Sequence, residues 1–158
     1  MFGSLFGKKQ DTFASPFTGR LCSITETPDE AFAEKMNGDG SMVQPADGDV
    51  YAPADSRVNF VFEMKHALGL TAKDGMEYML HIGIDTVNLQ GKGFTVFVTE
   101  GQAVKKGDKL MTFDMAYLKA NAPSDACLCV FTDLSEGKAV TLLKTGNVNA
   151  MEEAVEIS

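Results

Sequence analysis

The chain contains only two histidines, and both stand where an imidazole could do chemistry. His81 opens the run His81-Ile82-Gly83-Ile84-Asp85-Thr86-Val87-Asn88-Leu89, in which a glycine interrupts an apolar strand that ends in a polar turn. His66 lies fifteen residues upstream, in a second apolar segment. Because imidazole has an unperturbed pKa of about 6.5, it keeps a nucleophilic nitrogen free near neutral pH. Two histidines close together are compatible with a metal pair, a general acid and base, or a phosphoryl carrier.

Period-two alternation predicts which way each histidine faces. In the segment 76–85 the strongly apolar face consists of Tyr78, Leu80, Ile82 and Ile84. His81 falls on the other face with Gly83, whose missing side chain is expected to leave room for a group the size of phosphate. In the segment 57–66 the alternation predicts a single apolar row: Val58, Phe60, Phe62, Met64 and His66. We therefore expect His81 to be reactive rather than a core residue.

Other chemistries find less support in the residue pattern. A zinc site usually needs three or four protein ligands, and no further histidine is present. Cys22, Cys127 and Cys129 are odd in number and lack CxxC spacing, so they predict buried, reduced thiols rather than a disulfide framework or a zinc knuckle. The sequence lacks a nucleophile elbow, a Walker loop and a Rossmann fingerprint. No metal or cofactor is therefore predicted.

Length and charge limit the class of protein. A chain of 158 residues is expected to form one soluble domain, here residues 13–158. Its net charge of -8 argues against a nucleic-acid partner, which needs clustered basic residues. Residues 1–12 are expected to be a flexible N-terminal segment. Within them, residues 1–10 combine three spaced apolar side chains with two lysines, which favours either contact with an anionic membrane surface or a frayed terminus. The segment is too short to span a bilayer, so we expect a cytoplasmic protein, peripheral at the inner membrane face if that contact forms.

Short apolar runs separated by Gly, Asp, Asn and Pro predict an all-β, antiparallel fold with a few short helices. The segments 15–21, 45–50 and 52–58 each combine a proline, a turn and an emerging strand, which is a weak internal repeat. One helix is expected to start at Thr27 as its N-cap, with Pro28 at the first position and Glu30 completing a capping box, and to end at Gly38. A second short helix is expected near Asp114.

Several segments together resemble the glucose-family enzyme IIA component of the bacterial phosphoenolpyruvate-dependent sugar phosphotransferase system. The resemblance is centred on residues 81–89 and continues through Gly91-Lys92-Gly93-Phe94. It extends to residues 32–40, 62–67 and 100–108, and so covers nearly the whole chain. The family resemblance implies an antiparallel β-sandwich or barrel-like fold, known as the duplicated hybrid motif.

The resemblance also implies a phosphotransferase activity with a phosphohistidine intermediate. His81 would accept a phosphoryl group from the carrier protein HPr and pass it to a cysteine in the IIB domain of a sugar permease. His66 would orient the phosphoryl group and stabilise its charge without being phosphorylated itself. The sugar is not identified, because its recognition resides in the permease.

A partner-binding rim around His81 is implied by the same resemblance. Its predicted members are Asp29, Phe32, Met36, Phe62, Met79, Asp85 and Val87. Taken alone, the four-residue spacing of Phe32 and Met36 indicates a stripe that packs on a sheet, and the resemblance reverses that interpretation. The two aspartates would complement basic residues of HPr and contribute mainly to the rate of encounter.

Two alternatives remain from other classes. The first is a regulatory binding module whose docking on transporters or metabolic enzymes is switched by phosphorylation. The second is a metallopeptidase related by fold. One departure concerns the site itself: Met64 stands where relatives commonly have a threonine, whose hydroxyl can anchor a histidine tautomer. A second departure is Cys127-Leu128-Cys129, where relatives have Thr-Pro character.

Overall fold

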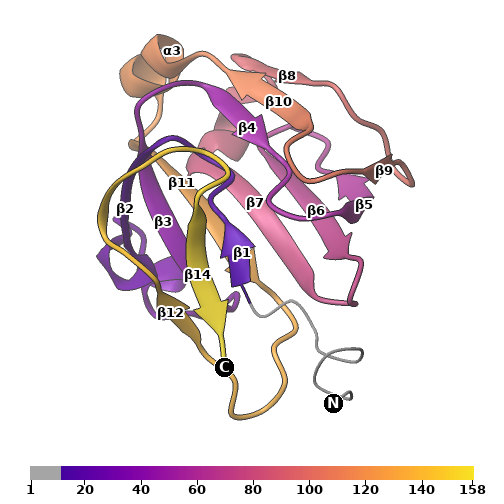
Figure 1. The fold of residues 1–158 in the computed structure, drawn as a ribbon. Helices are drawn as coiled ribbons and strands as arrows, with labels where there is room; N and C mark the ends of the chain where they lie inside the picture. Colours follow the sequence, from indigo (N-terminus) through magenta and orange to yellow (C-terminus); the bar gives the residue numbers. More distant parts are fainter. Residues whose placement is uncertain (1–11) are drawn as a thin grey trace, which may run out of the picture.

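The computed structural model describes residues 12–158, which fold into one eight-stranded and two three-stranded antiparallel sheets (Figure 1). In spatial order, the large sheet consists of β13 (Gly146–Val148), β2 (Gly19–Ser23), β3 (Asp39–Pro45), β11 (Ser124–Phe131), β7 (Glu77–Ile84), β6 (Ala67–Ala72), β5 (Ser56–Val61) and β9 (Ala103–Val104). The small sheets are β1 (Thr12–Ala14), β14 (Glu153–Ile157) and β12 (Val140–Leu142), and β4 (Asp49–Tyr51), β10 (Lys109–Phe113) and β8 (Phe94–Val96). The predicted all-β, antiparallel sandwich is confirmed.

The helices are short. They are α2 (Glu30–Ala33), α3 (Met115–Asn121) and the 3-10 helices η1 (Ile24–Glu26) and η2 (Thr86–Leu89). Within residues 12–158, no helix has the length and apolar character needed to cross a membrane. The predicted membrane contact of residues 1–10 lies outside the described residues.

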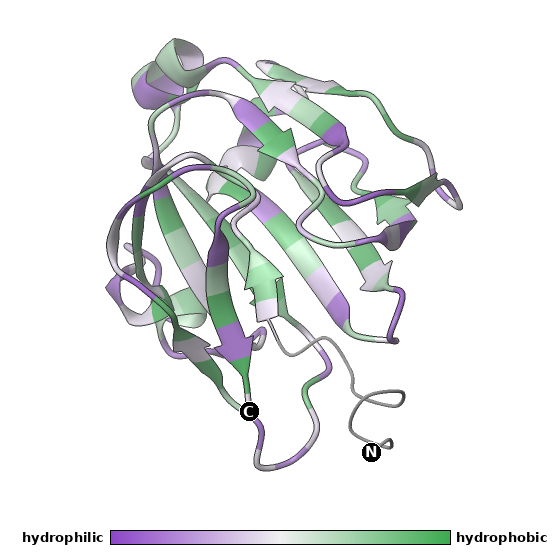
Figure 2. Cartoon of the chain, viewed as in Figure 1, coloured by the Kyte–Doolittle hydropathy of each residue, from purple (hydrophilic) through white to green (hydrophobic). Residues whose placement is uncertain are grey.

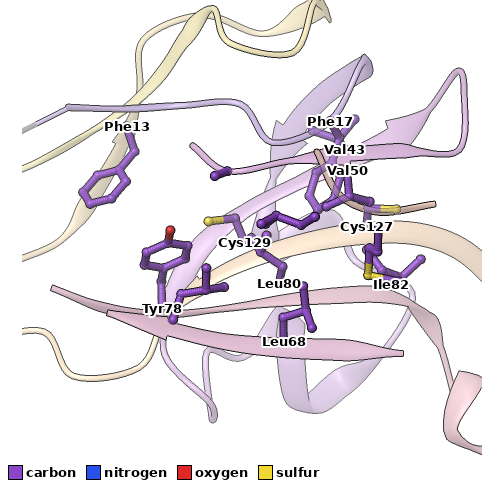
Figure 3. Close-up of a cluster of buried hydrophobic side chains, with 14 of the residues drawn as sticks. Phe13, Phe17, Val43, Val50, Leu68, Tyr78, Leu80, Ile82, Cys127 and Cys129 are labelled. Carbon is purple, nitrogen blue, oxygen red and sulfur yellow. The ribbon is translucent and has the colours of Figure 1, made fainter. Parts of the chain in front are cut away.

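The main core lies between one face of the large sheet, here called the inner face, and the two small sheets. β7 contributes Tyr78, Leu80 and Ile82, all at most 1% exposed. Figure 3 shows them with other residues of the large sheet and with Phe13 and Val50 of the small sheets. Phe13 of β1 meets the ring of Tyr78 edge to face, with the centroids 5.7 Å apart. The Tyr78 hydroxyl is paired with the Ser56 hydroxyl at 2.6 Å, so the buried phenol keeps a hydrogen bond.

A smaller apolar cluster covers part of the opposite, outer face of the large sheet. This outer cluster consists of Cys22, Ile24, Met42, Ile84, Ala126, Leu128 and Val130. Phe32 of α2 and Met79 of β7 pack against it. The outer cluster therefore gives the outer face of the large sheet an apolar layer that is separate from the main core.

The predicted alternation in β7 is confirmed as far as Ile82 and wrong at Ile84. Along β7, apolar and more polar residues follow one another (Figure 2), and His81 lies on the outer side. Ile84 joins the outer cluster instead of the main core. The reason is Gly83, whose φ of +75° turns the chain, while the pairing with β11 shifts register between Ser124 and Cys127.

The single apolar row predicted for the segment 57–66 is also wrong. The register of β5 against β6 shifts between Val58 and Phe60. Val58 is fully buried, whereas Phe60 is pushed to the outer face. The strand then ends at Val61, and a turn leads to His66, directly before β6.

The helix predicted with Thr27 as its N-cap begins two residues later. Asp29 is the N-cap of α2, and its carboxylate accepts a hydrogen bond from the Phe32 amide at 3.1 Å. Thr27 instead ends η1, with its hydroxyl donating to the Ile24 carbonyl at 2.6 Å. The helix ends at Ala33, well before Gly38. The second predicted helix is confirmed, since Asp114 is the N-cap of α3.

Candidate functional site

Neighbouring strands bring the two histidines together. Ala67, the first residue of β6, pairs with His81 in β7, and the Ile82 amide donates to the His66 carbonyl at 2.9 Å. The two imidazole rings stand edge to face, with centroids 5.1 Å apart and planes at 85°. The two histidines are therefore neighbours, as expected, and the hydrogen-bonded pairing of the backbone around them sets their positions.

The turn before β6 holds His66 in place. The Phe62 amide donates to the Ala67 carbonyl at 3.1 Å, and the Lys65 amide donates to the Phe62 carbonyl at 2.8 Å. Lys65 has a φ of +63°, which closes the turn. As a result the chain reverses so tightly that only 7% of His66 is exposed.

Aromatic rings frame the histidine pair on both sides. Phe62 contacts His66 edge to face, with centroids 5.4 Å apart. Phe32 lies tilted against His81, with centroids 5.0 Å apart. Phe32 is positioned by the Asp29 cap of α2 and by the outer cluster beneath it. This apolar frame limits the access of water to the imidazoles.

Both imidazoles are neutral near neutral pH. Burial, reinforced by repulsion from His66, lowers the pKa of His81 to about 4, although the Gly83 backbone and the Asp29 carboxylate act in the opposite direction. Burial also lowers the pKa of His66. Each Nδ1 is buried and makes no hydrogen bond to any of the residues 12–158. A neutral ring retains the nitrogen lone pair that a nucleophile requires.

The space beside Gly83 is not available for a phosphoryl group, which corrects the expectation from the sequence. A Cβ at Gly83 would lie 2.5 Å from Cγ2 of Thr86, a fully buried residue. The Thr86 hydroxyl also donates to the Ile82 carbonyl. Gly83 is thus required by its positive φ and by the close approach of Thr86.

Of the predicted rim, Asp29, Phe32, Phe62 and Met79 are half-buried around the histidines or on the outer cluster that supports them. The other three members are exposed on flanking segments: Met36 after α2, Asp85 at the end of β7 and Val87 in η2. Met36 is 73% exposed, so it does not pack on the sheet.

Two residues with structural influence on the site were not anticipated. Phe60 stacks against Phe62 with centroids 4.6 Å apart, and Thr86 shapes the turn after His81. The only sequence signal for Phe60 is the Phe-Val-Phe spacing with Phe62, since its bulge depends on β6. Met64 is half-buried in the same turn and has no hydroxyl to offer His66.

Metal and thiol chemistry receive no geometric support in the described part of the chain. No group of three or more His, Cys, Asp or Glu side chains in residues 12–158 is arranged to hold a metal ion. Cys22, Cys127 and Cys129 are free and buried. Burial raises the pKa of Cys129 to about 12, which leaves the thiol protonated and unreactive.

Comparison with known proteins adds independent information. Residues 11–137 match the family model described as phosphoenolpyruvate-dependent sugar phosphotransferase system, EIIA 1. The glucose-specific EIIA component of Oceanobacillus iheyensis is 40% identical over 160 residues, covering 98% of this chain and 97% of that protein. The glucosamine-specific EIICBA component of Bacillus subtilis is 45% identical over 126 residues, covering 80% of this chain and 20% of that protein.

A solved structure agrees with the sequence comparisons. Glucose permease IIA from Mycoplasma capricolum superposes with a TM-score of 0.86 at 37% sequence identity. The match covers 95% of this chain and 97% of that one. Sequence and backbone therefore identify the same group of relatives.

Proposed function

This chain belongs to the EIIA 1 family of the phosphoenolpyruvate-dependent sugar phosphotransferase system, and we propose that His81 is its phosphoryl-carrying residue. Membership implies a phosphocarrier role in sugar uptake, with HPr and a IIB or permease component as partners. The observation that carries the proposal is the pair of neutral imidazoles, 5.1 Å apart, inside an aromatic frame. That arrangement suits reversible transfer between protein nucleophiles.

The first transfer takes place between two histidines. Nε2 of His81 attacks the phosphorus of phospho-HPr, because Nδ1 is buried. The N–P bond on HPr breaks as the new N–P bond forms. The departing imidazole takes up a proton from solvent and leaves as a neutral ring, and His81 gives up its ring proton to solvent, so that charge and protons balance. Catalysis of such a step is mainly positioning and charge stabilisation. Phe32 and Phe62 exclude water that would hydrolyse the labile bond.

His66 assists without forming a bond to phosphorus. Its ring stands edge-on to His81, so an Nε2–H can donate to a phosphoryl oxygen and stabilise the charge in the transition state. In the second transfer a cysteine thiolate of IIB attacks the phosphorus, the N–P bond to His81 breaks, and an S–P bond forms. His66 remains in place for both steps.

Incubation with phosphoenolpyruvate, enzyme I and HPr tests the acceptor. One phosphate per chain is expected, acid-labile and located on His81, and His81→Ala is expected to take up none. Stoichiometric uptake by His81→Ala would contradict the assignment. Intact mass spectrometry under alkaline conditions measures both outcomes.

The role of His66 is tested in the second transfer. His66→Gln is expected to accept phosphate but to hinder onward transfer to IIB, because the amide cannot replace the imidazole donor. Normal sugar phosphorylation by this variant would refute the role. Phosphorylated and unphosphorylated samples used in pull-downs also test the regulatory alternative, since a pure carrier retains no stable partner outside its transfer chain.

A further inference from the structure

We propose that Phe60 is a docking residue for the phosphoryl donor and is covered by phospho-HPr during transfer to His81. The proposal rests on the function proposed above. It extends the partner-binding surface to a residue that the rim predicted from the sequence does not include.

Phe60 reaches the functional face because of a backbone irregularity. The register shift between Val58 and Phe60 places Phe60 opposite Gly69 on the outer face of the large sheet. Its ring lies over Gly69, 3.2 Å from where a Cβ of that residue would be. Even so, 43% of Phe60 remains exposed. The absence of a side chain at Gly69 leaves room for the ring, which therefore lies against β6 and is still partly open to solvent.

The ring of Phe60 is continuous with the reactive site. Starting from Phe60, ring centroids are separated by 4.6 Å to Phe62, 5.4 Å to His66 and 5.1 Å to His81. Phe32 adds a fifth ring 5.0 Å beyond His81. The row thus runs from β5 to α2 across the site. Its Phe32 end is packed against the outer cluster, whereas its Phe60 end is open to solvent.

The size of a protein interface places Phe60 beneath the donor. A specific interface covers about 800 Å² on each partner, which corresponds to a circle of about 16 Å radius. Three ring-to-ring steps of about 5 Å keep Phe60 inside a patch of that size centred on His81. A donor that brings its phosphohistidine to His81 and covers a patch of this size therefore has Phe60 within its reach.

The charges nearby define the chemistry of the matching surface. Asp29 acts electrostatically on His81, the exposed Asp85 directly follows β7, and the chain carries a net charge of -8. Interfaces commonly place aromatic residues at the centre and charges at the rim. The donor surface that fits has an apolar centre beside its phosphorylated residue and basic residues around it.

Transfer from phospho-HPr to the variant Phe60→Ser tests the proposal. Phe97→Ser is the matched control, because Phe97 is 52% exposed and directly follows β8, which belongs to a small sheet and not to the large sheet that carries the row of rings. For Phe60→Ser we expect kcat/KM to fall about tenfold, while the maximal rate stays within about twofold. Phe97→Ser and Phe60→Leu are expected to stay within about threefold of the wild type. Rapid-quench measurement over a range of phospho-HPr concentrations separates the two parameters.

The imidazole NMR signals of His66 and His81 distinguish docking from support of Phe62. They should be unchanged in Phe60→Ser. Transfer at the wild-type rate, an equal loss in Phe97→Ser, or a lower maximal rate with shifted imidazole signals would overturn the proposal. Failure of the proposed function would look different, since the wild type itself would then accept no phosphate on His81.

Discussion

The two faces of β7 place alternate residues of one strand in opposite surroundings. On the inner face, Leu80 is fully buried in the main core. On the outer face, His81 is only half-buried and contacts the half-buried ring of Phe32 and the buried ring of His66. The difference shows how a small domain can secure a strand on one side and leave the other side free for chemistry.

Two features of the structure hold the residues of the outer face in place. The hydrogen-bonded register of β6 and β7 holds the histidines, and the outer cluster holds Phe32 and Met79. Because side chains alternate between the two faces of β7, the residues that stabilise the fold and the residues of the candidate site lie on opposite faces. The comparison predicts that substitutions on the inner face change the free energy of unfolding, whereas exposed outer residues change transfer alone.

The largest effect is expected for Leu80→Ala. Removing a fully buried leucine side chain leaves a cavity and should lower the free energy of unfolding by about 2 to 5 kcal/mol. Urea unfolding followed by circular dichroism measures it. The variant that remains folded should still accept phosphate at the normal rate. A loss of transfer without a loss of stability would break the separation between faces.

The second effect concerns pH. Burial and repulsion from His66 lower the pKa of His81 to about 4 in the folded state, against about 6.5 when unfolded. Between these values the unfolded chain binds more protons, so stability falls as the pH drops from about 6.5 towards about 4. The full difference is on the order of 3 kcal/mol.

Urea unfolding of the wild type and of His81→Gln at about pH 7 and about pH 4.5 isolates this contribution. Carboxylates titrate in both proteins and cancel in the comparison. The wild type should lose about 2 to 3 kcal/mol more than the variant over this interval. Equal losses would show that the His81 environment on the outer face does not favour the neutral ring.

The third prediction distinguishes two reasons for a glycine at position 83: its positive φ and the close approach of Thr86. Gly83→Ala should cost about 2 to 4 kcal/mol, because φ is +75° and the added Cβ would meet Cγ2 of Thr86. Gly75→Ala is the control, since Gly75 also has a positive φ but no atom within 4 Å of the added Cβ. It should cost only about 1 to 2 kcal/mol. Equal losses of stability in the two variants would show that the contact with Thr86 does not contribute to the cost of Gly83→Ala.

The smallest change in stability is expected for Met36→Ser. Because Met36 is 73% exposed, its loss should alter the free energy of unfolding by no more than about 0.5 kcal/mol. Transfer from phospho-HPr should nevertheless slow several-fold if Met36 belongs to the docking rim. Met42→Ser, in the buried outer cluster, is the contrasting variant and should be clearly destabilised. An unchanged transfer rate for Met36→Ser would exclude Met36 from the predicted partner-binding rim.

Period-two patterning predicts the fold class and most of β7, because alternation follows directly from strand geometry. It correctly separates His81 from Tyr78, Leu80 and Ile82. That the two histidines meet is implied by the family resemblance and not by the alternation, because it depends on the pairing of β6 with β7. The alternation holds because it depends on residues close together in the chain.

The errors arise where strand pairing or backbone conformation, which period-two alternation does not encode, decides the local structure. The bulge before Phe60 depends on pairing with β6, and the switch at Ile84 depends on Gly83 and on the shifted register of β11. The helix start was misplaced for a different reason. Thr27 and Asp29 are both good N-cap residues, and only the geometry of η1 determines that Asp29 caps α2.

Because Ala67 pairs with His81, the distance between the two histidines can change through this pairing only by a register shift of a whole residue. Successive residues of a strand point to opposite faces, so a slip of one residue would turn His81 away from His66 entirely. Natural variation cannot adjust this distance in small steps through that pairing. At the far end of the hairpin, by contrast, a side chain added at Gly75 meets no atom within 4 Å. A label attached at that position, without any change in the length of the turn, would leave the reactive pair intact.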